Sequence, residues 1–102
     1  MRAFIAHPDE RAKVLAEPGL IGSAVEEILR YDGPTGALVR IVRVAHDFHG
    51  RALEKGDRVF SFVHAANHDP RKFPAPERFD VERSPNPHLT FGHGNHFCLG
   101  AN

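Results

Sequence analysis

Tryptophan is absent from this sequence, and tyrosine, methionine and cysteine each occur once among 102 residues. A single cysteine excludes an intramolecular disulfide and is typical of a reducing compartment, so we expect a cytoplasmic protein. The net charge at pH 7 is zero, which predicts no general affinity for nucleic acid. The chain has no apolar run of transmembrane length and no recognisable signal peptide. We therefore expect neither a nucleic-acid partner nor a membrane partner.

Glycine and proline are plentiful, with nine and eight residues, and most of the prolines lie in the second half of the chain. A segment this rich in turn residues has little apolar surface to bury on its own. Residues 1–102 are therefore predicted to form a single incomplete domain that belongs to something larger.

Hydrophobic periodicity and turn signals divide the chain into five segments and predict an α+β fold. They are a helix end with a short helix (1–19), a longer helix (20–31), short strands (37–63), an irregular segment (64–87) and a glycine-rich loop (88–102). Ser23 followed by Glu26 has the form of a capping box, which predicts a helix start near residues 21–23.

Two sets of charged residues stand out in this pattern. Glu27 and Arg30 are three residues apart on the polar side of the longer helix, which by itself favours a solvent-exposed pair worth about 0.2–0.5 kcal/mol. Arg40 and Arg43 lie in the predicted strand 37–45 and face opposite sides of it. Either one arginine interrupts an apolar face and needs an anion, or the strand lies at an edge and both arginines reach solvent.

The only cysteine, Cys98, lies in the glycine-rich stretch Phe91–Gly100. Glycine lets the backbone turn sharply there, so that N–H groups can approach the sulfur and stabilise a thiolate. The residues alone leave four interpretations open. Cys98 is a nucleophile activated by His93 or His96, a zinc ligand together with His88, His93 and His96, an axial ligand of haem iron, or an inert buried residue.

The stretch Phe91–Gly100 (Phe-Gly-His-Gly-Asn-His-Phe-Cys-Leu-Gly) closely resembles the haem-binding loop of cytochromes P450, with the pattern F-x-x-G-x-H/R-x-C-x-G. Further motifs precede it in the order found in that family. Glu27–Arg30 resembles the E-x-x-R motif, and Pro76–Phe79 resembles the P-E-R-F element. His68–Pro70, followed by Phe73, resembles the segment between them. The sequence is most similar in character to soluble bacterial members.

This resemblance implies haem b as the cofactor, with Cys98 as the metal ligand. The cofactor-binding residues that it implies are Arg40, His88, Phe91, His96, Cys98 and Gly100. The arginine and the two histidines would contact the haem propionates, and Phe91 would pack beside the sulfur. Glu27, Arg30 and Arg78 would form a buried ion-pair network that holds the irregular segment to the helix. No catalytic residue beyond the thiolate is implied.

The resemblance also implies a partial P450 fold with two or three short helices, a few short strands, a long irregular segment and the cysteine loop. The chain would then be a C-terminal haem-binding fragment of a bacterial monooxygenase. Such enzymes insert one oxygen atom from dioxygen into a small organic substrate, with electrons from a ferredoxin-type donor. The alternative is a truncated remnant without turnover, because the family's distal acid–threonine pair is not found near Thr35 or Thr90.

Overall fold

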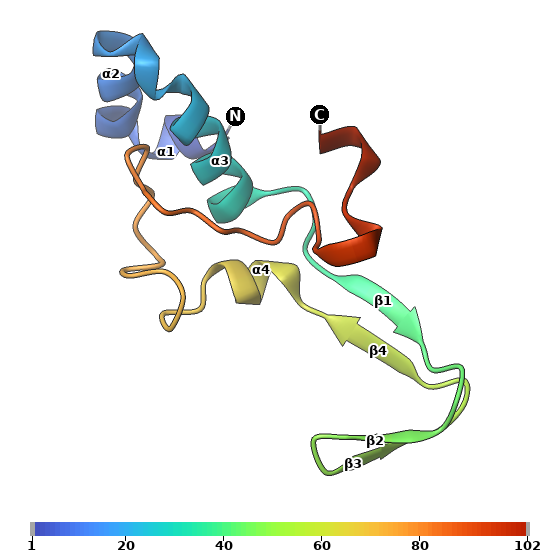
Figure 1. The fold of residues 1–102 in the computed structure, drawn as a ribbon. Helices are drawn as coiled ribbons and strands as arrows, with labels where there is room; N and C mark the ends of the chain where they lie inside the picture. Colours follow the sequence, from blue (N-terminus) through green and yellow to red (C-terminus); the bar gives the residue numbers. More distant parts are fainter. Residues whose placement is uncertain (1, 102) are drawn as a thin grey trace.

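The computed structural model describes residues 2–101, which contain short helices and two small antiparallel sheets (Figure 1). The elements in chain order are α1 (Arg2–Ala6), α2 (Pro8–Ala16), the 3-10 turn η1 (Pro18–Leu20), α3 (Ile21–Asp32), β1 (Leu38–Ile41), β2 (His46–Phe48), β3 (Arg51–Leu53), β4 (Arg58–Ser61), α4 (Val63–Asn67), η2 (Gly94–His96) and η3 (Leu99–Ala101). None of the helices in this described part combines the length and the apolar character that a membrane span requires. The predicted α+β class is confirmed.

A small hydrophobic core holds the N-terminal helices against part of the irregular segment. Its buried residues are Ala3, Ala24, Phe79 and Val81. The ring of Phe79 packs edge-on against Phe4, with the ring centroids 5.9 Å apart. The core therefore joins α1 and α3 to a stretch that has no regular secondary structure of its own.

Helix α3 begins at Ile21, within the predicted range 21–23, but without the predicted capping box. Ser23 lies inside the helix, and its hydroxyl donates a hydrogen bond to the Leu20 carbonyl at 3.0 Å. The capping-box prediction is wrong because η1 runs directly into α3. Leu20 already has nearly helical backbone angles (φ −77°, ψ −3°), whereas a capping residue needs an extended backbone.

The strands form two hairpin-like pairs. β1 pairs with β4, so that Arg40 lies opposite Val59, and β2 pairs with β3. The predicted strand 37–45 is shorter in the structure, because after Ile41 the backbone of Val42 bonds to the turn at Gly56 and Asp57 instead. The chain then passes into the second pair, whose turn lies at residues 49–50.

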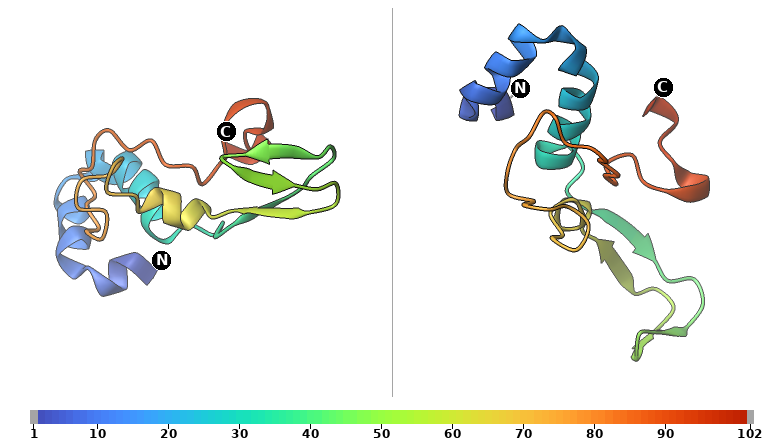
Figure 2. Two further views of the ribbon diagram at one scale, coloured as in Figure 1. Left: turned by 90° about the horizontal axis from the view of Figure 1, so that it is seen from below. Right: turned by 60° about the vertical axis from the view of Figure 1, so that its left-hand side comes forward.

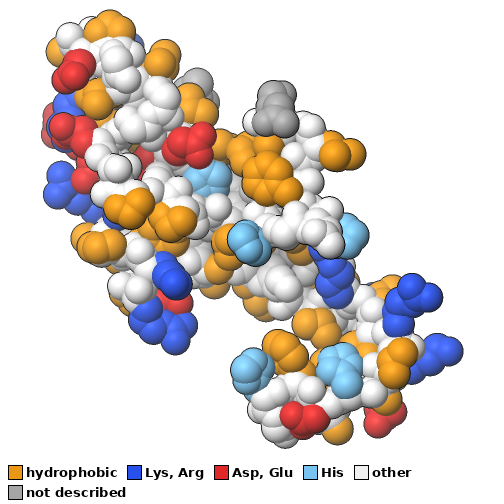
Figure 3. Space-filling view, in the orientation of Figure 1, with side chains coloured by type: hydrophobic (Ala, Val, Ile, Leu, Met, Phe, Trp, Pro, Cys, Tyr) orange, Lys and Arg blue, Asp and Glu red, His pale blue; other side chains and the backbone are white. Residues whose placement is uncertain are grey.

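The chain is extended, with helices α1–α3 at one end and the β2–β3 pair at the other (Figures 1 and 2). Its radius of gyration is 16.7 Å, compared with about 13 Å for a compact domain of 100 residues. Large hydrophobic side chains, including Leu15, Val44 and Leu99, are consequently exposed. Figure 3 shows such side chains on both the helical part and the strands.

Candidate functional site

Glu27 and Arg30 face the interior, and both side chains are 0% exposed. The Arg30 guanidinium donates from Nε and Nη2 to the two oxygens of the Glu27 carboxylate, at 2.8 Å each. Its remaining hydrogens go to the backbone carbonyls of Asn67, Pro76 and Arg78, at 2.9–3.1 Å. All five guanidinium N–H groups therefore have acceptors. The exposed pair favoured by the helical pattern alone is wrong.

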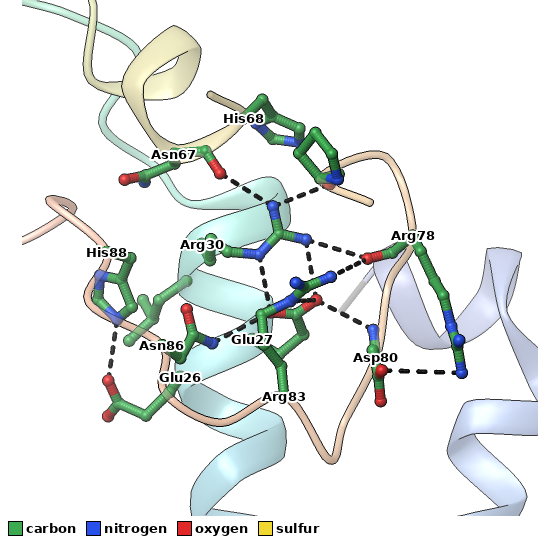
Figure 4. Close-up of polar contacts among 12 residues, drawn as sticks. Glu26, Glu27, Arg30, Asn67, His68, Arg78, Asp80, Arg83, Asn86 and His88 are labelled. Atoms are coloured by element: carbon green, nitrogen blue, oxygen red, sulfur yellow. Dashed lines mark hydrogen bonds and ion pairs between the residues drawn. The ribbon is translucent and has the colours of Figure 1, made fainter. Parts of the chain in front are cut away.

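The third charged member of this cluster is Arg83, whereas the resemblance implied Arg78 (Figure 4). Arg83 Nε lies 3.1 Å from both Glu27 oxygens, and its side chain is 8% exposed. The Arg78 side chain is 63% exposed and extends toward Asp80. Only the Arg78 carbonyl takes part, as an acceptor from Arg30 and Arg83. The prediction for the Arg78 side chain is therefore wrong.

The bend between the two arginines explains this exchange. The backbone N–H of Asp80 donates to Glu27 at 3.0 Å, which fixes the bend against the carboxylate. Arg83 folds back over the bend and donates to the carbonyls of Pro74 and Ala75 at 2.8 and 3.2 Å. Because the irregular segment has few backbone partners of its own, these bonds satisfy carbonyls that would otherwise lack them. Glu27, Arg30 and Arg83 are called the Glu27 network below.

Two buried residues that nothing in the sequence marks connect this network to the cysteine loop. Asn67 and Thr90 are 2% and 7% exposed. The Asn67 amide donates to the Thr90 hydroxyl at 3.0 Å, and that hydroxyl donates to the Leu29 carbonyl at 2.7 Å. Single polar residues of this kind carry no periodic signal, so only their position just before a recognised motif could have suggested them.

Cys98 lies in a tight turn and is exposed. Its backbone N–H donates to the Phe91 carbonyl at 2.9 Å, which closes the turn. Gly92 and Gly94 have φ angles of 76° and 72°, a region that glycine enters without strain. Gly100 follows the turn, and a Cβ atom there would lie 3.9 Å from the Cys98 sulfur. Space near the sulfur therefore does not require glycine at position 100.

The cysteine opens into a shallow hollow of about 210 Å³ between the loop and β1. The hollow is lined by Thr35, Leu38, Arg40, Thr90, Phe91, Gly92, His96 and Cys98. Arg40 is exposed, and its guanidinium donates to the Val39 carbonyl at 3.1 Å. Within residues 2–101 no carboxylate pairs with Arg40. The structure thus brings four of the predicted site residues together: Arg40, Phe91, His96 and Cys98.

His88 does not join them. Its side chain is 4% exposed, and its Nε2 atom lies 2.9 Å from the Glu26 carboxylate (Figure 4). The Thr90 backbone N–H donates to Nδ1 at 3.3 Å, so we assign the ring proton to Nε2. Both ring nitrogens are therefore engaged away from the hollow. The predicted propionate contact of His88 does not fit this geometry.

The structure also decides among the other interpretations of Cys98. No group of three or more metal-ligating side chains comes together within residues 2–101, so the zinc interpretation is wrong. The exposure of Cys98 contradicts the inert buried residue. Within the same residues, neither His93 nor His96 hydrogen-bonds to the sulfur. The interpretation of Cys98 as a nucleophile therefore lacks a general base in contact with the thiol. The Ala101 N–H donates to the Cys98 carbonyl, at 3.3 Å, and not to the sulfur.

A surface carboxylate beyond α4 has a lowered pKa. Asp69 accepts three hydrogen bonds from the Arg71 side chain and one from its backbone N–H, at 2.6–3.1 Å. These bonds lower the pKa of Asp69 to about 2. The Asp69 carbonyl also accepts from Phe73, whose ring lies 5.5 Å from the Arg30 guanidinium. This exposed pair therefore borders the buried network.

Known proteins match nearly the whole chain. A family profile described as Cytochrome P450 matches residues 14–102. The Biotin biosynthesis cytochrome P450 of Bacillus subtilis (strain 168) is 46% identical over 98 residues, which cover 96% of this chain and 25% of that protein. Cytochrome P450 monooxygenase PikC of Streptomyces venezuelae is 43% identical over 102 residues, covering 99% and 24%.

The fold agrees with these matches. The solved structure of the cytochrome P450 PksS of Bacillus subtilis 168 superposes with a TM-score of 0.93 at 40% identity, covering 97% of this chain and 26% of that one. The chain spans about a quarter of the length of the curated relatives that it matches. Its short helices, strands and irregular segment thus form part of the P450 fold. On the profile, the identities and the fold, the chain belongs to the cytochrome P450 family.

Proposed function

We propose that this chain is the C-terminal, haem-binding part of a bacterial haem-thiolate monooxygenase, with Cys98 as the axial ligand of the iron in haem b. The observation that carries the proposal is the hollow that Cys98 shares with Arg40 and His96. A thiol, an imidazole and a cation that no carboxylate pairs within residues 2–101 lie together there, although Arg40 is far from the other two residues in the sequence.

The residues of the hollow fit a haem. Thiolate sulfur is one of the ligands that proteins use for haem iron. Arginine binds carboxylates in a charge-assisted geometry, so Arg40 is suited to a propionate, with His96 as a second donor. Leu38 and Phe91 supply an apolar wall of the hollow. Gly92 also lines the hollow and leaves space there because it has no side chain. His88 is left out of this set, since its ring is engaged with Glu26.

The Glu27 network has a structural role in this proposal. It holds residues 74–83 against α3 through the bonds described above. The same helix carries Leu29, to which Thr90 bonds just before the cysteine loop. Glu27, Arg30 and Arg83 therefore stabilise the part of the chain to which the cysteine loop is bonded. They would not contact the cofactor.

The bound haem would supply the oxygen chemistry of the family, in which the axial thiolate favours cleavage of the O–O bond. The whole protein would insert one atom of dioxygen into a small organic substrate, with electrons from a ferredoxin-type donor. Support comes from family membership and from a relative whose name states that it is a monooxygenase. This chain would position the thiolate and one wall of the cofactor site.

A second candidate is a haem-binding chain without turnover. The specific observation in its favour is that Leu99, one residue after Cys98, is 99% exposed, so residues 2–101 do not cover the chain on this side of the cysteine. Thr90 is also unsuited to a distal proton-delivery role, because its hydroxyl is held by Leu29 and Asn67. Sequencing of the DNA on both sides of the reading frame distinguishes the two candidates by the presence or absence of a distal acid–threonine helix.

Haem reconstitution tests the ligand assignment. The protein is loaded with haem, reduced and exposed to carbon monoxide, and the red-shifted Soret band typical of thiolate ligation is expected. Cys98→Ala should abolish this band, whereas the control Asn95→Ala, in the same exposed loop, should keep it. A wild-type spectrum without the band, or a band that survives in Cys98→Ala, would contradict the proposal.

A further inference from the structure

We propose that Asn67 and Thr90 form a link that positions the cysteine loop on the end of α3, and that Asn67 is a positioning residue for the Cys98 thiolate. This role rests on the proposed function, because it concerns Cys98 as the haem ligand. The link consists of three hydrogen bonds: Asn67 to Thr90, Thr90 to Leu29, and the Leu89 N–H to Asn67.

The Thr90 hydroxyl completes the C-terminal end of α3. Leu29 lies in the last turn of this helix, where carbonyl groups lack partners within the helix. The hydroxyl donates to the Leu29 carbonyl at 2.7 Å. Gly33 permits this approach, since a Cβ atom there would lie 2.2 Å from that carbonyl oxygen and 3.1 Å from the Thr90 methyl group.

Asn67 fixes the orientation of Thr90. Because the hydroxyl hydrogen of Thr90 is directed to Leu29, its oxygen can only accept from Asn67, and the asparagine amide supplies the required N–H at 3.0 Å. The amide oxygen of the same side chain accepts the Leu89 N–H at 2.8 Å. The Asn67 carbonyl accepts from Arg30 at 2.9 Å, which joins the link to the Glu27 network. One buried side chain thus holds two consecutive residues.

Within residues 2–101, the hydrogen bonds that tie the cysteine loop to other segments are made at Leu89 and Thr90, with partners at Leu29, Asn67 and the His88 ring. Within the described part of the chain, every hydrogen bond made by residues 91–101 has its partner within residues 89–101. The Phe91 carbonyl, which anchors the Cys98 N–H at 2.9 Å, comes directly after Thr90. A change in the link therefore moves the atom that sets the position of the cysteine backbone.

The inference is tested in the haem-loaded protein by following the thiolate band of the reduced carbon monoxide complex. Thr90→Val keeps the shape of the side chain but removes the hydroxyl, and Asn67→Ala removes the amide. Each should lose the band about tenfold faster than wild type, at a temperature where circular dichroism shows the protein folded. Thr90→Ser restores the hydroxyl and should behave as wild type.

Val81→Ala is the matched control, because Val81 is fully buried in the core and lies outside the link. It lowers stability without touching Asn67 or Thr90, so the band should decay at the wild-type rate below its unfolding temperature. Equal decay in Val81→Ala and Thr90→Val would overturn the positioning role while the haem assignment stands. A wild-type protein without the thiolate band would overturn the proposed function itself, and the link with it.

A variant that fails to fold does not block the test. Asn67→Asp keeps an acceptor for the Leu89 N–H, and its carboxylate cannot donate to Thr90, so it tests the bond between Asn67 and Thr90 separately. Faster loss of the thiolate band in Asn67→Asp than in wild type supports the link. An unchanged rate in this variant, together with an unchanged reduction potential, contradicts it.

Discussion

In the Glu27 network the charged groups are buried and hydrogen-bonded to one another, whereas Arg40 and Cys98 in the hollow are exposed and have few partners within residues 2–101. Each guanidinium hydrogen of Arg30 has an acceptor, and the Glu27 carboxylate receives bonds from three side chains and a backbone N–H. Arg40 bonds only to a carbonyl of its own strand within residues 2–101, and Cys98 has no side-chain partner there.

This difference between the Glu27 network and the surroundings of Cys98 distinguishes a structural role from a ligand-binding role. The hydrogen-bonding groups of this buried network are already engaged within the protein. Removing Glu27 would leave two buried cations without their carboxylate, and removing either arginine would leave buried acceptors with fewer donors. Exposed donors around a hollow remain available to a ligand. The comparison supports the proposal that the network is structural and that the loop binds the cofactor. The following substitutions test that division, from the largest expected effect on stability to the smallest.

Arg30→Ala should have the largest effect, about 3–5 kcal/mol lost from the free energy of unfolding, because it breaks a buried ion pair and removes a donor from three backbone carbonyls. Urea unfolding followed by circular dichroism measures the loss. Arg30→Lys is the control, since it keeps the charge but not the paired donors, and it should fall between Arg30→Ala and wild type. A loss near zero in Arg30→Ala would show that the network is not structural.

Arg83→Ala and Arg78→Ala form the next pair. Arg83 donates to the buried carboxylate, so its removal should cost about 2 kcal/mol. Arg78 has an exposed side chain, and its removal should change stability by no more than about 0.5 kcal/mol. The same urea titration compares the two, and the opposite ranking would restore Arg78 as the network arginine.

Gly33→Ala tests the contact between the two regions. The added methyl group would meet the Leu29 carbonyl oxygen at 2.2 Å, which predicts a loss of about 1–3 kcal/mol. Gly36→Ala is the matched control, because a Cβ atom there has no neighbour within 4 Å. Thermal unfolding of both variants provides the measurement, and equal midpoints would show that the close approach at Gly33 is not needed.

Cys98→Ser should leave the stability of the haem-free protein within about 0.5 kcal/mol of wild type, because the side chain is exposed. The same variant should lose the thiolate spectrum in the haem-loaded protein. This combination is the reverse of that expected for Arg83→Ala. A large loss of stability in haem-free Cys98→Ser would show that the loop is part of the folding core.

The smallest effect concerns pH. The pKa of Asp69 is lowered from 3.8 to about 2, so its ionised form stabilises the folded state. That contribution is complete above pH 3.8 and is lost as the pH falls through about 2. The stability difference between wild type and Asp69→Asn should therefore shrink over this range, and added salt should reduce it at neutral pH. A difference that grows on acidification would contradict the assignment.

Motifs predicted the important positions better than periodicity did. The helical pattern placed Glu27 and Arg30 on a solvent-exposed side, because it cannot show that an irregular segment covers that side. The P-E-R-F resemblance located the covering segment but selected Arg78 in place of Arg83. Which arginine reaches the carboxylate depends on the direction of the bend at Asp80, and no local pattern encodes that direction.

His88 shows the same limit near the loop. Its position before the cysteine motif suggested a cofactor contact, but its Nε2 atom is hydrogen-bonded to the Glu26 carboxylate on α3. Asn67 and Thr90 carry no local signal, because each acts through partners more than twenty residues away in the sequence.

The sequence by itself predicted the family and the α+β class correctly, and it identified Cys98 as the candidate haem ligand. These follow from local motifs, turn residues and the presence of a single cysteine. Only the tertiary structure decided that Arg83 completes the network, that His88 turns away from the hollow, and that Asn67 and Thr90 carry the loop. The physical reason is that buried hydrogen-bond donors and charges must find partners, and those partners are brought together by the path of the chain and not by spacing along it.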